Sequence, residues 1–164
     1  MYEIERRFLI KDFDAMWQDI VDHGTENEEI HQGYMSTDQN KTIRVRLTTN
    51  RTTGANPAFL TVKGKTVGIK KMEIEEEISV INALALYQNF CETKIYKVRH
   101  SVKLNGMIWE LDEFPGDLDH RRWIAEIELT SEDQEIVLPS WLGEEITSDH
   151  RYSNANMSKT GWPE

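Results

Sequence analysis

Hydrophobic and charged residues alternate with a period of two in many short segments, from one end of the chain to the other. In residues 71–78, for example, acidic side chains and Lys71 occupy alternate positions, while Met72, Ile74 and Ile78 occupy positions between them. Such alternation is typical of β-strands that bury one face. The pattern recurs at residues 3–10, 43–47, 59–63, 71–78, 96–102, 109–112 and 125–129, with a further strand expected around 32–36. About eight strands are therefore predicted.

Two segments have the spacing of amphipathic helices instead. Residues 12–23 end before Gly24, where we expect a left-handed residue to stop the helix. Residues 80–92 follow Ser79, whose hydroxyl is a suitable N-cap. A third, shorter helix is expected within residues 150–160.

Composition narrows the class of protein. The length of 164 residues indicates a single domain over residues 1–164. The formal net charge of −10 argues against a broad basic face for duplex nucleic acid. The lone Cys91 excludes an internal disulfide and a cysteine zinc cluster. Neither a signal peptide nor a membrane span is expected, because charges interrupt the N-terminus and no apolar run approaches about 20 residues. We therefore expect a cytoplasmic protein with no membrane or duplex nucleic-acid partner.

The charged sides of the strands change this picture. For any single strand, a solvent-exposed polar face is the simplest explanation. Taken together, however, the positions are almost all ionisable and arrive as same-sign pairs two residues apart, about 6.5–7 Å from one another. About eight antiparallel strands can close into a barrel, which removes exposed edges and encloses a lumen. We therefore predict a mainly β (α+β) fold, an eight-stranded antiparallel closed barrel with a charged lumen and a few flanking helices.

A lumen with clustered bases beside clustered acids suits a polyphosphate accompanied by hard divalent cations. Lys and Arg side chains would hold the phosphates, and carboxylates would hold Mg²⁺ or Mn²⁺, which prefer oxygen ligands. The sequence shows no Ser-His-Asp or Cys-His arrangement that would favour a covalent intermediate. Charge neutralisation of a small-molecule polyphosphate is the chemistry that this pattern favours.

The motifs, in their order along the chain, resemble those of the CYTH superfamily, the triphosphate tunnel metalloenzymes. Residues 3–9, Glu-Ile-Glu-Arg-Arg-Phe-Leu, correspond to the family's N-terminal E-x-E-x-K. Similar segments are Gln32-Gly33-Tyr34, Arg44-Val45-Arg46, residues 60–64, the acidic run 73–77, Lys97-Val98-Arg99, residues 109–112, residues 125–129, residues 139–143 and residues 151–154. The chain is most similar to the short bacterial inorganic triphosphatases. The resemblance implies a charged tunnel, dependence on a divalent metal and action on a triphosphate.

The resemblance also implies roles for individual residues. The metal-binding acids would be Glu3, Glu5, Glu126 and Glu128. The substrate-binding bases would be Arg7, Arg44, Arg46, Lys63, Lys97, Arg99 and Arg151. The candidates for catalytic roles are Glu73, Glu75, Glu110, Asp112 and Lys71. Either one of these carboxylates or a second metal ion would orient the attacking water, and the sequence does not choose between them.

Two features depart from the family's pattern. Arg7 stands where the family has Lys, so a planar fork of donors replaces a point charge. Residues 116–123 also differ from the Gly-Leu that the family usually has shortly before the match at 125–129. The first departure bears on the choice of substrate more than on phosphate binding.

Hydrolysis of inorganic triphosphate to pyrophosphate and phosphate is the activity that the resemblance implies. Two alternatives keep the same fold: a class IV-type adenylate cyclase, and a triphosphatase acting on thiamine triphosphate or a nucleoside triphosphate. A third alternative is a polyphosphate-binding module without turnover. The sequence leaves open whether the protein forms a homodimer.

Overall fold

All eight strands that the alternation predicts are present in the computed structural model, which describes residues 1–116 and 122–164. The elements are β1 (Tyr2–Ile10), α1 (Phe13–His23), β2 (Gly24–Asp38), β3 (Lys41–Asn50), β4 (Ala58–Val67), β5 (Lys70–Ile78), α2 (Val80–Asn89), β6 (Thr93–Leu104), β7 (Met107–Glu113), β8 (Trp123–Glu128), β9 (Leu142–Glu145), a 3₁₀ turn (His150–Tyr152) and α3 (Asn154–Thr160). In the part of the chain that the structure describes, no helix is both long and apolar enough to cross a membrane.

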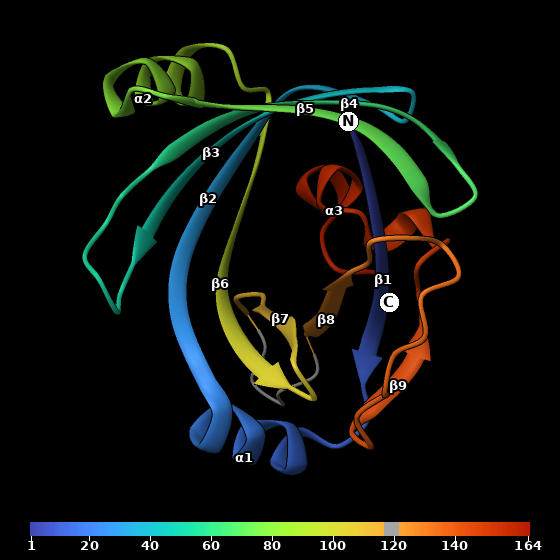
Figure 1. Ribbon diagram of the computed structural model, residues 1–164. Coiled ribbons are helices and arrows are strands. Elements are labelled where there is room, and N and C mark those ends of the chain that lie inside the picture. The colour runs from blue at the N-terminus through green and yellow to red at the C-terminus, as the bar shows by residue number, and fades with distance from the viewer. Residues whose placement is uncertain (117–121) are drawn as a thin grey trace.

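The strands form one antiparallel sheet that closes on itself (Figure 1). Its order is β5-β4-β3-β2-β6-β7-β8-β1-β9, and β1 pairs also with β5, so the first eight strands make a complete barrel. The closing pairing is short, with three residue pairs from Tyr2↔Met72 to Ile4↔Lys70. From Phe8 onward the same edge of β1 pairs with the extra strand β9. The predicted barrel is confirmed, with β9 as an addition that the alternation did not reveal.

The main hydrophobic core lies outside the barrel wall, between the sheet and α1. Phe8, Trp109, Leu111 and Trp123 are buried there with Met16 of α1. Since Trp109 and Leu111 alternate with Glu110 and Asp112, burying the apolar pair outside directs the acids into the lumen. A smaller core of Val45, Ala58 and Ala83 lies where α2 covers β3 and β4.

The C-terminal segment fills one end of the lumen. Leu9, Ile95, Phe114 and Ile124 share the inward parity of the charged residues on their strands. These four side chains pack against Ile146, Tyr152, Met157 and Trp162. Residues 146–162, which we call the C-terminal plug, thus place α3 within the ring of strands (Figure 1). The lumen has an apolar, closed end and a charged remainder.

Several expectations about boundaries were wrong. The strand expected at 32–36 is the 15-residue β2, which begins at Gly24. Gly24 is extended (φ −63°, ψ 135°), not left-handed. It is needed because a Cβ there would lie 2.4 Å from the carbonyl oxygen of Ile20. The third helix is divided at Ser153, whose side chain caps α3 after the 3₁₀ turn. Of the divergent segment 116–123, residues 117–121 lie outside the described residues.

The close approach at Gly24 generates a stability prediction. Gly24→Ala should lower the melting temperature by several degrees, because the backbone must shift to admit the new methyl group, and overpacking of this kind costs about 1–3 kcal/mol. Gly64→Ala is the matched control, since its Cβ would meet Met72 at an ordinary 3.6 Å. Thermal unfolding followed by circular dichroism measures both. Equal melting temperatures for the two variants would contradict the close approach.

Candidate active site

The lumen contains a cavity of about 210 Å³ with walls formed almost wholly by ionisable side chains. The lining residues are Glu3, Glu5, Arg44, Arg46, Lys63, Glu73, Glu75, Lys97, Arg99, Glu110, Glu126, Glu128 and Asn154. Twelve of the thirteen are charged, and each of these twelve is among the residues singled out from the sequence. The structure therefore brings together residues from seven strands that are up to 125 positions apart.

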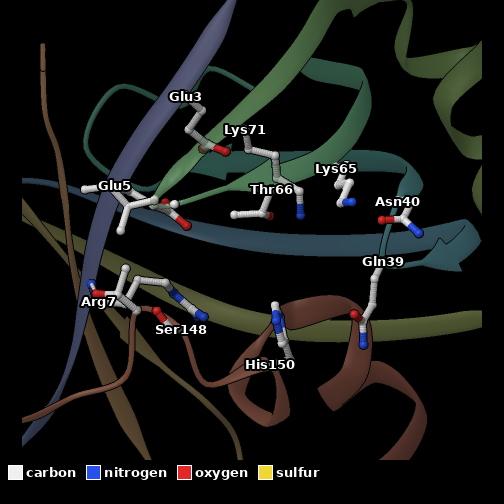
Figure 2. A pocket seen from close by; sticks show the side chains of 13 residues that line it. Glu3, Glu5, Arg7, Gln39, Asn40, Lys65, Thr66, Lys71, Ser148 and His150 are labelled. Atoms are coloured by element: carbon white, nitrogen blue, oxygen red, sulfur yellow. Dashed lines mark hydrogen bonds between the residues drawn. The ribbon is translucent and has the colours of Figure 1, made fainter. Parts of the chain in front are cut away.

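A second cavity, of about 320 Å³, adjoins the first where the neighbours of β1 change from β5 to β9. Figure 2 shows the side chains that line this second cavity. Glu3 and Glu5 line both cavities, while Arg7 and Lys71 line this one. The remaining walls come from the β2–β3 turn, the β4–β5 hairpin and the loop before α3, including Asn40, Lys65 and His150. The short β1–β5 pairing thus leaves a gap in the barrel wall beside the charged lumen. Arg7 and Lys71 are placed at this gap.

Asp112 lies behind the bases of the lumen. Its side chain is fully buried and accepts hydrogen bonds from Lys97 Nζ (2.6 Å) and from Arg99 Nε (2.7 Å). Burial alone would raise the pKa of Asp112, but the charges of Arg99 and Lys97 hold it well below its usual value. The sequence suggested that Asp112 orients water. Asp112 lines neither cavity, so this arrangement does not place it for that role. It fixes the positions of two bases instead.

Burial lowers the pKa of Lys97, although the charge of Asp112 acts to raise it. The pKa of Lys97 is lowered to about 8, first by burial and then by the neighbouring charge of Arg99. Arg99 is buried too, yet its contacts with Asp112, Glu110 and Glu126 raise its pKa. Arg99 is therefore a fixed cation, whereas Lys97 can lose its proton not far above neutral pH.

Glu126 connects β8 to two bases. Its carboxylate accepts from Arg7 Nε at 3.0 Å and from Arg99 at 3.1 Å. Burial and Asp112 both act to raise the pKa of Glu126, but Arg7, Lys97 and Arg99 lower it to about 2. Glu126 is thus ionised at any pH at which the protein is expected to work.

On the opposite wall, ion pairs connect β4 and β5 to β1 and β3. Lys63 Nζ donates to Glu3 at 2.6 Å and lies 3.2 Å from Glu73. Arg44 contacts Glu75 at 3.3 Å, and both also contact the buried hydroxyl of Thr61. Most of the acids in the lumen are therefore already neutralised by a base.

Of the five bases that line the lumen cavity, Arg46 is the one without a carboxylate partner among the ion pairs of the described residues. Its Nε donates to the buried Gln32 side chain at 2.8 Å, and Gln32 in turn donates to the Tyr34 hydroxyl at 3.2 Å. Burial and then repulsion from Arg44 and Arg99 lower the pKa of Arg46 to about 10, so it stays charged near neutral pH. An uncompensated guanidinium of this kind is suited to an anionic ligand.

Glu5 and Glu128 are acids without a basic partner, just as Arg46 is a base without an acidic one. They lie directly opposite each other on β1 and β8, and neither forms an ion pair with a described residue. Burial, then the charges of Glu126 and Glu3, raise the pKa of Glu5 to about 7, and burial and Glu3 raise that of Glu128. Like charges directly opposite each other destabilise a sheet. A bound cation would remove that repulsion.

No group of three or more His, Cys, Asp or Glu side chains among residues 1–116 and 122–164 is arranged as a ready metal site. The four acids proposed from the sequence explain why. Glu3 is engaged by Lys63 and Glu126 by Arg7 and Arg99, which leaves the Glu5–Glu128 pair without a base. These two carboxylates are the part of the set that is open to a cation in this arrangement.

Arg151 does not reach the lumen. Its side chain is 66% exposed and pairs with Asp149 at 2.7 Å, within the same turn. Its placement at a substrate phosphate is therefore not supported here. The sequence reasoning also missed three neutral residues: Gln32 and Thr61, which hold bases, and Asn154, which lines the cavity. Thr61 shares the parity of Lys63, a signal that was available, whereas Asn154 belongs to the plug and follows no strand pattern.

Comparison with known proteins agrees with the resemblance seen in the sequence. A family model described as CYTH domain matches residues 1–160. An inorganic triphosphatase of Acetivibrio thermocellus is 35% identical over 158 residues, covering 96% of this chain and 93% of the relative. One of Nitrosomonas europaea is 34% identical over 161 residues, covering 96% and 97%. The crystal structure of the inorganic triphosphatase NE1496 is similar with a TM-score of 0.57 and 33% identity, covering 95% of this chain and 93% of that one.

The Glu5–Glu128 pair generates a prediction about stability without metal. The pKa of Glu5 is raised from 4.5 to about 7, so the folded state holds this proton more tightly than the unfolded state does. Ionisation of Glu5 therefore destabilises the fold as pH rises from about 4.5 through 7. In EDTA at pH 8, Glu5→Gln should raise the melting temperature by about 3 °C or more, with a smaller gain at pH 5.

The exposed Glu77 on β5 provides the control for this prediction. Glu77→Gln should leave the melting temperature within about 1 °C of wild type at both pH values, since exposed substitutions rarely have large effects. A lower melting temperature for Glu5→Gln than for wild type at pH 8 would show that Glu5 is compensated by a partner in the metal-free protein.

Proposed function

This chain belongs to the CYTH domain family, and on that basis we propose that it hydrolyses inorganic triphosphate to pyrophosphate and phosphate inside the barrel. The observation that carries the proposal is the composition of the lumen. Five bases and seven carboxylates line one cavity of about 210 Å³, with an uncompensated guanidinium and an uncompensated pair of acids within the same walls. A polyanion accompanied by a cation complements both features.

The bases would hold the substrate and offset its charge. Arg46 forms no ion pair, so it would contact a phosphate without breaking a bond to a carboxylate. Lys97 and Arg99, aligned by Asp112, present a second fixed pair of donors from β6. Charge-assisted hydrogen bonds of this kind both orient a phosphoryl group and neutralise the charge that develops during its transfer.

Mg²⁺ or Mn²⁺ fits the carboxylate set. The hard oxygen donors, the direct opposition of Glu5 and Glu128, and the raised pKa values of both support this assignment. Glu5 and Glu128 would hold the ion, with Glu3 and Glu126 as further ligands once their bases turn to the substrate. When bound, such an ion neutralises phosphate oxygens and makes water a better nucleophile.

In the reaction, water attacks the terminal phosphorus, and the bridging P–O bond breaks so that pyrophosphate leaves. A carboxylate of this chain would accept the proton of the water. Glu110 is a suitable acceptor, because it lines the cavity, burial raises its pKa, and its contact with Arg99 keeps it in place. Glu73 and Glu75 line the opposite wall, where they pair with Lys63 and Arg44.

The walls favour an inorganic substrate over a nucleotide. Among the described residues, no Phe, Tyr or Trp side chain on which a base could stack lines the lumen cavity or the cavity at the gap, and the single imidazole there is that of His150. An adenylate cyclase would need to position adenosine as well as the triphosphate. We also propose that the protein works in the cytoplasm without a nucleic-acid partner, in keeping with its single unpaired Cys91 and its net charge of −10.

The activity is tested with purified protein, tripolyphosphate and either Mg²⁺ or Mn²⁺. We expect pyrophosphate and phosphate in equal amounts, no turnover in EDTA, and no cyclic AMP from ATP. Glu128→Gln should reduce kcat at least about 100-fold, because it removes a cation ligand. Glu77→Gln, on an exposed part of β5, should stay within twofold of wild type. Formation of cyclic AMP at a comparable rate would favour the cyclase instead.

Arg7 gives a separate test at the position that departs from the family's Lys. Its Nε donates to Glu126 and its Nη1 to the carbonyl oxygen of Tyr152 at 2.9 Å. Lys cannot reproduce this fork, so Arg7→Lys should lower kcat/KM for tripolyphosphate by up to about tenfold and change its ratio to that for ATP. Arg7→Ala should lose about 100-fold or more on both substrates, since it leaves Glu126 without this base.

The neighbouring Arg6 is the control for these variants. It lies on the other side of β1 and pairs with Glu145. Arg6→Ala should therefore keep kcat/KM within twofold. An unchanged substrate ratio in Arg7→Lys would exclude a role in selectivity, and an active Arg7→Ala would place Arg7 outside the site.

A further inference from the structure

A small third cavity lies between the charged lumen and the C-terminal plug. Its volume is about 80 Å³, and it has four cations but a single acid in its walls. The lining residues are Arg7, Arg44, Lys63, Lys71, Glu5, Tyr34, Thr42, Ser153, Asn154 and Ala155. We call it the plug chamber. Its size and excess of positive charge suit one phosphoryl group.

Three of the residues that line the plug chamber each have a buried polar atom without a hydrogen-bond partner among the described residues. These atoms are Nη2 of Arg7, Nε of Arg44 and Oδ1 of Asn154. Buried polar groups in folded proteins are nearly always paired, and an unpaired one is costly. Two of the three are donors on guanidinium groups, so an anion with several acceptor oxygens would satisfy them.

Asn154 is placed to take part in the same interaction. It is the first residue of α3, and the capping bond that starts this helix is made by Ser153, so the Asn154 side chain is free of that task. The bond from Arg7 to the carbonyl oxygen of Tyr152 fixes the backbone just before it. Asn154 also lines the main cavity, and thus stands between the two spaces.

We infer that Asn154 is a substrate-contacting residue supplied by the plug, and that its carboxamide donates a hydrogen bond to the end phosphoryl group seated in the plug chamber. This inference rests on the proposed function for the identity of the ligand, an inorganic triphosphate. The carboxamide carries both a donor and an acceptor. Its NH₂ group turns to a phosphate oxygen, while Arg7 Nη2 and Arg44 Nε donate to the remaining oxygens.

Binding without turnover tests the contact. Tripolyphosphate is titrated into the full-length protein in EDTA by isothermal calorimetry. Asn154→Ala should weaken Kd about tenfold, the effect of losing one hydrogen bond to a charged group. Asn154→Asp should weaken it about 100-fold or more, because it loses the donor and adds a negative charge beside the phosphate.

Ser158→Ala is the matched control on the same helix. Ser158 bonds Thr93 at 2.8 Å and lines none of the cavities, so its loss loosens the attachment of α3 without altering the chamber. Its Kd should stay within twofold of wild type. Equal weakening by Ser158→Ala and Asn154→Ala would assign the effect to seating of the plug, and unchanged binding in both Asn154 variants would also overturn the inference.

A kinetic readout separates this contact from the proposed hydrolysis. If the protein hydrolyses tripolyphosphate, Asn154→Ala should raise KM about tenfold and leave kcat within threefold, since the phosphoryl group in the plug chamber is the end opposite to the one that water attacks. A protein that binds tripolyphosphate without turnover would refute the hydrolase, while the calorimetric ranking of the variants would still decide the role of Asn154.

Discussion

Opposite charges facing one another across a closed lumen are the interaction on which the rest of this structure depends. Burying an isolated ion is costly, so most charges inside the barrel are paired with a charge of opposite sign. Arg99 shows the principle, because it contacts Asp112, Glu110 and Glu126 at once. The outer wall then supplies the apolar burial that the lumen cannot. Each strand satisfies both demands by alternating its residues.

The plug closes one end of the lumen, and a gap in the barrel wall lies beside the plug, where the partner of β1 changes. The plug packs against the inward-facing Leu9, Ile95, Phe114 and Ile124, so the closed end of the lumen is apolar. One edge of β1 pairs with β5 for three residues and then with β9. The change of partner leaves the cavity of about 320 Å³ beside Arg7. A ligand entering through this cavity meets acids, bases and His150 of the plug together.

Alternation made the barrel and most of its lumen predictable from sequence, because period two is a local property of each strand. It predicted eight strands and the direction of the side chains on each. It could not rank residues of equal parity: Glu110 and Asp112 look alike in sequence, yet Glu110 lines the cavity and Asp112 is sealed behind two bases. The first half of β2 is polar on both faces, and the plug and β9 depend on long-range packing. Arg151 was proposed from a family motif and not from the alternation within a strand, and its side chain lies outside the lumen.

The charge balance of the lumen constrains how any polyphosphate can enter. Seven carboxylates against five bases leave an excess of two negative charges in the walls when all are ionised. A triphosphate alone would add several more and meet a net repulsion, although individual bases such as Arg46 and the walls of the plug chamber would attract it. A divalent cation at Glu5 and Glu128 cancels the excess where repulsion between acids is strongest. It also allows Lys63 and Arg7 to release Glu3 and Glu126 and turn to phosphate. Cation and polyanion should therefore bind cooperatively, each lowering the electrostatic barrier to the other.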